Sequence, residues 1–331
     1  MKIIIPAAGI GTRLRPHTHL LPKAMLQVAG RPIIGHIIDT VTRDLEVSEL
    51  IIIVGYKKES LMEWVSRTYP GVPLRFVEQE EMLGLGHAVL MAEPFVQEGD
   101  ELFIILGDTI VDMDLPGMVS MGCSALGTRE VDDPRRFGVA EIREGMITRL
   151  VEKPDVPPSR MALMGVYYIK EAADLFRSIR HIMDEGIKTK NEYQITDALN
   201  HMIAEGIRMK PFNVDNWFDC GTIETLLETN RFLLHKMIPG KQEGGTGSVV
   251  IPPVFIGEGA SVQGSVIGPD VSVGAHVTVR NSVIRDAIIY DNADIRDVIA
   301  EKSIFGTNCQ VRGTFARMNT GPDTQLGERT K

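Results

Sequence analysis

A glycine-rich loop near the amino terminus is the first segment whose residues could do chemistry. The apolar residues 3–5 lead into Ala-Ala-Gly-Ile-Gly-Thr-Arg-Leu-Arg-Pro at 7–16 and then into Pro22-Lys23. Glycines after a buried strand let backbone N–H groups approach a phosphate closely, because no side chain stands in the way. Arg13 and Lys23 add positive charge. The loop is therefore expected to hold a polyphosphate, through Ala8, Gly9, Gly11 and Thr12 as well as the two cations.

Two common phosphate-binding loops do not fit this segment. A dinucleotide-binding loop needs a third small residue and an immediate helix, but Leu14 stands at that position, and Pro16 and Pro22 prevent a long uninterrupted helix. A Walker A loop needs Gly-Lys-Ser/Thr, which the segment lacks. What remains is a long, basic loop at the carboxyl end of the first strand, where open α/β sheets bind ligands.

Two aspartates could supply oxygen ligands to a metal ion. Asp108 follows the apolar residues 102–106, so it is expected at the carboxyl edge of a strand, although an isolated Asp there could also cap a helix. Asp219 lies in a second turn, Trp-Phe-Asp-Cys-Gly at 217–221. Because Mg²⁺ typically takes one or two carboxylates together with phosphate oxygens, the two aspartates are a candidate magnesium site.

These motifs together resemble those of the sugar nucleotidylyltransferases. Gly-x-Gly-Thr-Arg-Leu-x-Pro at 9–16, with Pro22, Lys23 and Met25, is similar to the family's signature loop, and the glucose-1-phosphate thymidylyltransferases and uridylyltransferases are the most similar members. Four later motifs occur in the family's order: Leu-Gly-Leu-Gly-His-Ala at 83–88, Leu-Gly-Asp at 106–108, Glu-Lys-Pro at 152–154 and the turn at 217–221. The likeness covers residues 1 to about 236.

The resemblance implies a separate role for each group of site residues. Asp108 and Asp219 would hold Mg²⁺, and Arg13 and Lys23 would be the catalytic cations at the α-phosphate and the departing pyrophosphate. The sugar phosphate would be bound by the residues Gly138, Glu152, Lys153 and Lys190, with Lys153 on the phosphate, Glu152 on sugar hydroxyls, the Gly138 backbone nearby and Lys190 as a further cation. For Lys153 the alternative is an ordinary solvated lysine.

The base would be bound by Gln79 and Gly84. Gln79 stands five residues before Gly84, which is the family's spacing for a residue that reads the base. An amide can donate to and accept from a pyrimidine edge, and the alternative is a surface glutamine. His87, in the same motif, is expected to be a buried or capping residue and not a catalyst.

The implied reaction joins a nucleoside triphosphate to a hexose 1-phosphate and releases pyrophosphate, with Mg²⁺ as cofactor. The resemblance favours dTTP. Glucose is favoured because residues 162–164 are Ala, Leu and Met, where relatives that act on N-acetylated sugars tend to offer Asn and Thr. Three alternatives stay open: a UTP-dependent uridylyltransferase, an enzyme with an additional acetyltransferase activity, and a non-catalytic regulatory subunit of similar fold.

The elements that must position these residues follow an α/β pattern. Residues 3–6, 50–54, 74–77 and 102–106 are predicted to be buried parallel strands, with helical spacing at 32–45, 58–68 and 86–92 between them. Strands at 138–142 and 163–169 and helices at 172–184, 195–204 and 222–236 follow. The pattern predicts a catalytic domain at 1–237, with a Rossmann-like open mixed sheet covered by helices on both faces.

The remaining sequence predicts a different architecture. After a Gly- and Pro-rich linker at 238–246, aliphatic residues recur every five or six positions, namely Ile256, Val262, Ile267, Val273, Val279, Ile284, Ile289 and Ile295. This hexapeptide periodicity predicts a short left-handed parallel β-helix of three or four coils over 247–318, and a flexible tail at 319–331. A β-meander is the alternative. The β-helix is too short for an acetyltransferase domain, and no histidine follows His276. We expect it to mediate a homo-oligomer, either through the end that the catalytic domain does not cover or through its flat faces around Val273, Val279 and Ile284.

The amino-acid composition limits the binding partners and the cellular compartment that we expect for the protein. The chain has 331 residues, with 44 acidic against 35 basic side chains and a net charge of −9, which opposes non-specific binding to nucleic acid or anionic membranes. Cys123, Cys220 and Cys309 lack the spacing of a zinc site or disulfide framework. No run of eighteen apolar residues occurs. We therefore expect a cytoplasmic protein without nucleic-acid or membrane partners.

Overall fold

The computed structural model describes residues 1–237 and 245–313. These residues belong to two compact units, of which the first is Met1–Leu233 and the second begins at Leu234. The domain boundaries drawn from the sequence stay predictions. Most of the predicted linker (238–244), the end of the predicted β-helix (314–318) and the whole predicted tail (319–331) lie outside the described residues.

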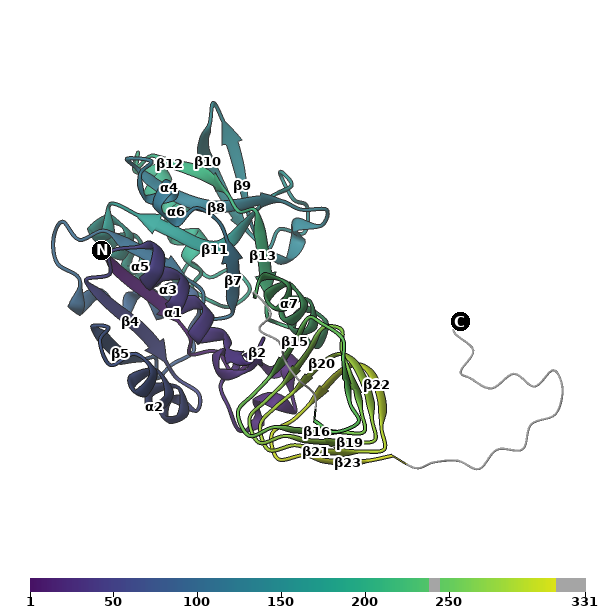
Figure 1. Ribbon diagram of the computed structural model, residues 1–331. Coiled ribbons are helices and arrows are strands. Elements are labelled where there is room, and N and C mark those ends of the chain that lie inside the picture. Colours follow the sequence, from purple (N-terminus) through teal and green to yellow (C-terminus); the bar gives the residue numbers. More distant parts are fainter. Residues whose placement is uncertain (238–244, 314–331) are drawn as a thin grey trace. The chain divides into compact units, whose positions relative to one another are not determined.

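A mixed sheet forms the centre of the first unit (Figure 1). Its strands run in the order β10-β9-β11-β6-β1-β4-β5. Their bounds are β1 Lys2–Pro6, β4 Glu49–Val54, β5 Leu74–Glu78, β6 Leu102–Ile105, β9 Gly138–Arg143, β10 Met146–Glu152 and β11 Met161–Ile169. β1 pairs in parallel with β4 and β6, and β4 pairs in parallel with β5, as the four apolar runs predicted. β11 is antiparallel to β6, so the sheet is mixed.

Several short elements were not predicted. Strands β8 (Ser124–Glu130) and β12 (Met209–Asn213) extend the sheet beside β11, and β12 is parallel to β8. Two small antiparallel ribbons complete the strands of this unit. They are β2 (Gln27–Val28) with β3 (Arg31–Pro32), and β7 (Thr109–Asp112) with β13 (Asn216–Asp219). The second ribbon joins segments more than a hundred residues apart in the sequence.

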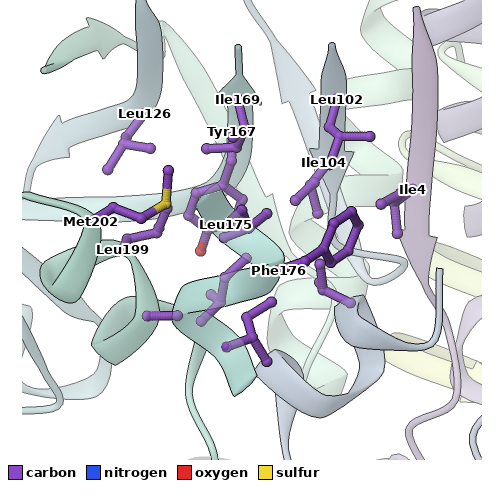
Figure 2. Packing of buried hydrophobic residues seen from close by; sticks show 14 of the residues in the cluster. Ile4, Leu102, Ile104, Leu126, Tyr167, Ile169, Leu175, Phe176, Leu199 and Met202 are labelled. Carbon is purple, nitrogen blue, oxygen red and sulfur yellow. The ribbon is translucent and has the colours of Figure 1, made fainter. Parts of the chain in front are cut away.

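The helices are α1 Ile33–Asp44, α2 Lys58–Thr68, α3 Leu85–Leu90, α4 Leu115–Val119, α5 Ala172–Asp184, α6 Ile195–Ala204 and α7 Ile223–Lys236. α5 and α6 have the bounds predicted from their periodicity. In Figure 2, Phe176 of α5 lies beside the sheet residues Ile4 and Ile104, and Leu199 and Met202 of α6 lie beside Leu126 of β8; all belong to one buried cluster. The alternate strand residues Ile3, Ile5 and Phe103 are also fully buried, so both sheet faces are covered. Burial on both faces explains why these strands are continuous apolar runs.

The second unit contains a β-helix of parallel strands, which Figure 1 draws as stacked green-to-yellow rungs. The strands are β14 Val249–Val250, β15 Val254–Ile256, β16 Ser261–Gln263, β17 Val266–Ile267, β18 Val271–Val273, β19 Thr278–Arg280, β20 Val283–Ile289, β21 Asp294–Arg296, β22 Ile299–Phe305 and β23 Gln310–Arg312. The predicted aliphatic rungs stack in register, for example Val262 on Val279 and Ile267 on Ile284. This confirms the repeat architecture.

The expected oligomer interface stays a prediction, but the three residues that marked its flat faces are not themselves on the surface. Val273, Val279 and Ile284 are each 0% exposed, because they point into the β-helix and form its core. The large aliphatic side chains that are exposed in the described part of this unit include Val249, Ile251, Val283 and Ile299, with exposed fractions of 56%, 42%, 43% and 88%. A periodic aliphatic residue in a β-helix is an inward rung, so the same pattern that predicts the fold removes those residues from the surface.

Candidate active site

The glycine-rich loop of residues 7–25, named the phosphate loop here for its expected ligand, follows β1 without forming a long helix. It contains three single-turn 3₁₀ helices, Thr12–Leu14, His17–His19 and Lys23–Met25, as the two prolines predicted. Leu14 is fully buried and anchors the loop, while Thr18 donates a 2.9 Å hydrogen bond to the carbonyl of Gly11. Gly11 has φ +68°, and a Cβ there would lie 3.0 Å from Cβ of Lys23. Glycine at 11 therefore lets Lys23 pack beneath the loop.

Backbone pairing brings the two predicted metal ligands together. Asp108 lies between β6 and β7, and the register of β7 with β13 places Thr109 opposite Asp219. The N–H of Cys220 also donates a 3.0 Å hydrogen bond to the carbonyl of Asp108. The ammonium of Lys23 lies 2.5 Å from Oδ2 of Asp108 and 3.6 Å from Oδ1 of Asp219. Two carboxylates and one buried lysine therefore form a single charged cluster.

Arg13 reaches the same cluster from the phosphate loop. A Cβ added to Gly221 would lie 2.9 Å from Nη2 of Arg13 and 2.8 Å from both carboxylate oxygens of Asp219. The turn after β13 thus brings the guanidinium and the carboxylate to the same small space. Cys220 beneath this turn is fully buried, and burial raises the pKa of its thiol to about 12. Cys220 is therefore uncharged at neutral pH.

A second group of polar residues lies where β9 pairs with β10. Glu152 is opposite Gly138 in the register, and its side chain is 8% exposed. Thr196, in the first turn of α6, donates a 2.7 Å hydrogen bond to Oε2 of Glu152, and Lys153 Nζ lies 3.1 Å from Oε1. Lys153 has φ +40°, a conformation that L-residues adopt at a cost of about 1–3 kcal/mol and that is common at ligand sites. Both Glu152 oxygens are thereby held in place.

Both groups line one cleft of about 630 Å³. The predicted residues on its wall are Ala8, Gly9, Gly11, Thr12, Arg13, Lys23, Gln79, Gly84, Asp108, Gly138, Glu152, Lys153 and Asp219. Lys190 is the exception, since it lines an adjoining cavity of about 460 Å³ together with Arg13, Arg136 and Lys153. Its Nζ lies 3.4 Å from Oδ1 of Asp155. The structure therefore gathers all but one of the predicted residues around one space, and places the last beside it.

The side chain of Gln79 is buried and hydrogen-bonded to its neighbours, unlike the surface glutamine that the sequence left as an alternative. It is 4% exposed, and its Nε2 donates to the carbonyl of Gly84 at 3.2 Å and lies 3.1 Å from Nδ1 of His87. His87 is partly buried and is absent from the residues that line the cleft.

Some residues of the cleft were not predicted. Thr196, Gln194, Arg136 and Tyr167 line it without belonging to a motif that the sequence analysis used. Tyr167 is buried, and this burial raises the pKa of its phenol, so it stays neutral. Only Gln194 and Thr196 had a local signal, because they start a helix whose amino-terminal end could be recognised from its periodicity.

No helix among residues 1–237 and 245–313 has the length and apolar character needed to span a bilayer. Nor does any set of three or more His, Cys, Asp or Glu side chains in these ranges form a self-sufficient metal cluster.

Comparison with known proteins places this cleft in a family. Residues 2–236 match the family model described as nucleotidyl transferase. The UTP–glucose-1-phosphate uridylyltransferase AglF of Haloferax volcanii is 34% identical over 225 residues, which cover 66% of this chain and 89% of that protein. The glucose-1-phosphate thymidylyltransferase of Streptomyces antibioticus is 32% identical over 274 residues, covering 79% of this chain and 74% of the other.

A solved structure gives the same result in three dimensions. The crystal structure of UDP-glucose pyrophosphorylase complexed with UDP-glucose superposes with a TM-score of 0.61 at 27% identity, over 71% of this chain and 99% of that chain. The family model spans more than half of the chain and covers each cleft residue named above. The chain belongs to the nucleotidyl transferase family.

Proposed function

We propose that this protein transfers a nucleotidyl group from a nucleoside triphosphate to a hexose 1-phosphate and releases pyrophosphate. The observation that carries the proposal is the composition of the cleft. The cluster of Lys23, Asp108 and Asp219 and the pair of Glu152 and Lys153 line the same space of about 630 Å³. This volume is suited to a nucleotide with a sugar attached. The names of the relatives, a uridylyltransferase and a thymidylyltransferase of glucose 1-phosphate, agree with it.

The reaction needs no side chain to act as a general base. A phosphate monoester has a second pKa of about 6, so the sugar phosphate is already a dianion near neutral pH. The protein must then align two anions and stabilise the charge that moves to the leaving group. Lys23 and Arg13 would stabilise the α-phosphate and the departing pyrophosphate, and Lys153, with Lys190 beside it, would hold the attacking phosphate. Glu152, fixed by Thr196, would accept hydrogen bonds from sugar hydroxyls.

Asp108 and Asp219 fit a magnesium ion. Their oxygens converge on one ammonium group, so the space between them already accommodates a positive charge. Carboxylate oxygens are the ligands that Mg²⁺ prefers, and the further ligands would be substrate oxygens and water, because no third acidic, His or Cys side chain completes a cluster among the described residues. Bound there, Mg²⁺ would neutralise phosphate charge and polarise the phosphorus centre.

The finer specificity of the proposal is dTTP and glucose 1-phosphate. The side-chain amide of Gln79 in the cleft wall can pair with an edge of thymine or uracil. Leu163 and Met164 in the same wall offer no amide or hydroxyl for an N-acetyl group. UTP is the second candidate, and it is favoured by the uridylyltransferase relative.

A substrate panel tests the activity. Purified protein is incubated with each of the common nucleoside triphosphates, Mg²⁺ and either glucose 1-phosphate or N-acetylglucosamine 1-phosphate, and pyrophosphate release is measured. Release with a pyrimidine triphosphate and glucose 1-phosphate is the expected result. No release in any combination would leave the non-catalytic regulatory subunit as the better interpretation. An acetyl-transfer assay on the same samples tests the bifunctional alternative.

The proposal includes assembly into a homo-oligomer through the β-helix. Val249, Val266, Val283 and Ile299 stack in register at an outward position of successive strands and make an aliphatic column. Arg285 and Glu301 beside it form a 2.7 Å ion pair, which a two-fold related copy could match with opposite charge. Light scattering on wild type and Ile299→Lys tests it, with Gln310→Lys on another strand as the control. A monomeric wild type, or an Ile299→Lys protein that stays assembled, would exclude this surface.

A further inference from the structure

The side-chain amide of Gln79 has a defined orientation. The residue directly follows β5, and its backbone N–H donates a 2.8 Å hydrogen bond to the carbonyl of Val54. Its Nε2 lies 3.2 Å from the carbonyl oxygen of Gly84. A carbonyl oxygen only accepts hydrogen bonds, so the amide nitrogen, and not the amide oxygen, must face Gly84.

The acceptor at Gly84 is itself fixed. Gly84 has φ +119°, and a Cβ there would lie 2.6 Å from the carbonyl oxygen of Tyr193. Backbone hydrogen bonds of 2.8 Å join Tyr193 N–H to the carbonyl of Leu83, and Gly86 N–H to the carbonyl of Tyr193. The turn that presents the Gly84 carbonyl is therefore attached on both sides to a neighbouring segment, and it cannot follow a rotation of the amide.

His87 provides the second acceptor. Nδ1 of His87 lies 3.1 Å from Nε2 of Gln79, so an imidazole with its lone pair on Nδ1 accepts the second amide hydrogen. Gly84 and His87 together then take both N–H groups of the amide. Gln79 lines the cleft, and Oε1 is the polar atom it has left to offer a ligand. At this position the cleft presents an acceptor and no donor.

We infer that His87 is a positioning residue that keeps Gln79 in this orientation and thereby selects pyrimidines that carry a ring N–H. Uracil and thymine have a donor at N3, which Oε1 can accept. Cytosine has a bare lone pair at N3, which Oε1 would repel. Rejection of a ligand that leaves a buried polar group unpaired is stronger than discrimination by shape alone. The inference rests on the proposed function and specifies its base.

Substitutions at His87 separate the acceptor from the ring. His87→Phe keeps a ring of similar size and removes the acceptor, so the amide can rotate and present its N–H₂ to the cleft. His87→Asn restores an acceptor oxygen near the position of Nδ1. We expect wild type to prefer UTP or dTTP over CTP in kcat/KM. His87→Phe should lose about tenfold of that preference, roughly one hydrogen bond, through a higher KM for UTP or dTTP, while the KM for sugar phosphate stays unchanged. His87→Asn should retain most of the preference.

A double-mutant cycle tests whether His87 acts through Gln79. Gln79→Met removes the amide at similar length, and adding His87→Phe to it should change base preference no further. Thermal melting of each variant establishes that it is folded. An undiminished preference in His87→Phe would overturn the inference. So would equal losses in His87→Phe and His87→Asn, because the ring and not the acceptor would then be responsible, and so would additive losses in the double mutant.

Binding measurements keep this inference separate from the proposed function. Calorimetry with UMP and CMP needs no turnover, and wild type should bind UMP more tightly, with the difference reduced in His87→Phe. A protein that shows this pattern but releases no pyrophosphate with any substrate would refute the proposed reaction and uphold the role of His87. Turnover with equal affinity for UMP and CMP would uphold the reaction and refute the role of His87.

Discussion

The ammonium nitrogen of Lys23 lies 2.5 Å from Oδ2 of Asp108. This contact joins the phosphate loop after β1 to the turn after β6, across 85 positions of sequence. It gives a half-exposed carboxylate a buried positive partner, since the Lys23 side chain is 11% exposed and that of Asp108 36%. Lys23 and the proposed metal ion would therefore share the same two carboxylates. Each cation would neutralise part of the negative charge that remains when the other is bound.

The first prediction concerns the two carboxylates. Asp108→Asn or Asp219→Asn should lower kcat by at least about 100-fold, because each removes a charged oxygen ligand from the proposed Mg²⁺ ion. Pyrophosphate release at increasing Mg²⁺ measures the effect, and Asp184→Asn at the exposed end of α5 is the matched control. Wild-type rates in either cleft variant at saturating Mg²⁺ would eliminate the site.

The second prediction concerns the support of Glu152. Thr196→Val removes the 2.7 Å hydrogen bond to Oε2 with little change of shape, and it should raise the KM for sugar phosphate by about tenfold, or roughly 1–2 kcal/mol for a hydrogen bond to a charged group. Lys153→Ala should raise the same KM further, since its ammonium would contact the phosphate itself. Thr148→Val is the control, because the exposed Thr148 hydroxyl donates a 3.3 Å hydrogen bond to the carbonyl of Glu141 in β9. An effect limited to the KM of the nucleotide would contradict the assignment.

The third prediction compares two glycines that both have positive φ. Gly84 and Gly99 have φ of +119° and +87°, but a Cβ at 84 would meet the backbone of Tyr193, whereas one at 99 would meet nothing within 4 Å. Both alanine variants should lose about 1–3 kcal/mol of unfolding free energy from backbone strain. Gly84→Ala should lose more and should also raise the KM for the nucleotide. Chemical denaturation and kinetics check this, and equal losses without a kinetic effect would count against the packing argument.

The fourth prediction is a pH dependence of stability. Burial lowers the pKa of His36, whose Nε2 lies 2.8 Å from the carbonyl of Val28, below its usual value of 6.5. Below about pH 6.5, His36 is protonated in the unfolded chain but stays neutral in the folded protein. The free energy of unfolding therefore falls as the pH falls below about 6.5. His36→Gln keeps a donor for Val28 and does not titrate. Its melting temperature should fall less than that of wild type between pH 7.5 and 5.5, and parallel curves would refute the assignment.

The sequence was sufficient to predict the elements that bury a continuous apolar face. β1, β4, β5 and β6 are such runs, and α5 and α6 have clear helical periodicity. β7 and β13 were missed because each is only four residues long and is stabilised mainly by its partner more than a hundred positions away. That pairing is what places Asp108 beside Asp219, so the motifs suggested both ligands without showing why they meet.

The residues of the candidate site also fall into those that the sequence could reveal and those that only the structure reveals. Residues in motifs, such as Lys23 and Lys153, could be selected from the chain because their spacing resembles that of a family. Thr196 could not, because its role depends on a hydrogen bond to Glu152 that crosses 44 positions. The orientation of Gln79 was also out of reach, since an amide has the same sequence signal whether its nitrogen or its oxygen faces the cleft.

The register of the β-helix has a consequence for how the protein can change length. Val266 pairs with Val283, and Val283 with Ile299, in steps of 17 and 16 residues. Removing or duplicating one whole step would leave each inward side chain above another inward side chain, whereas half a step would bring polar residues into the interior. Duplication or deletion of one whole coil can therefore lengthen or shorten the carboxy-terminal unit by one step at a time. The length of the β-helix can thus change during evolution without any change to the cleft residues of the first unit.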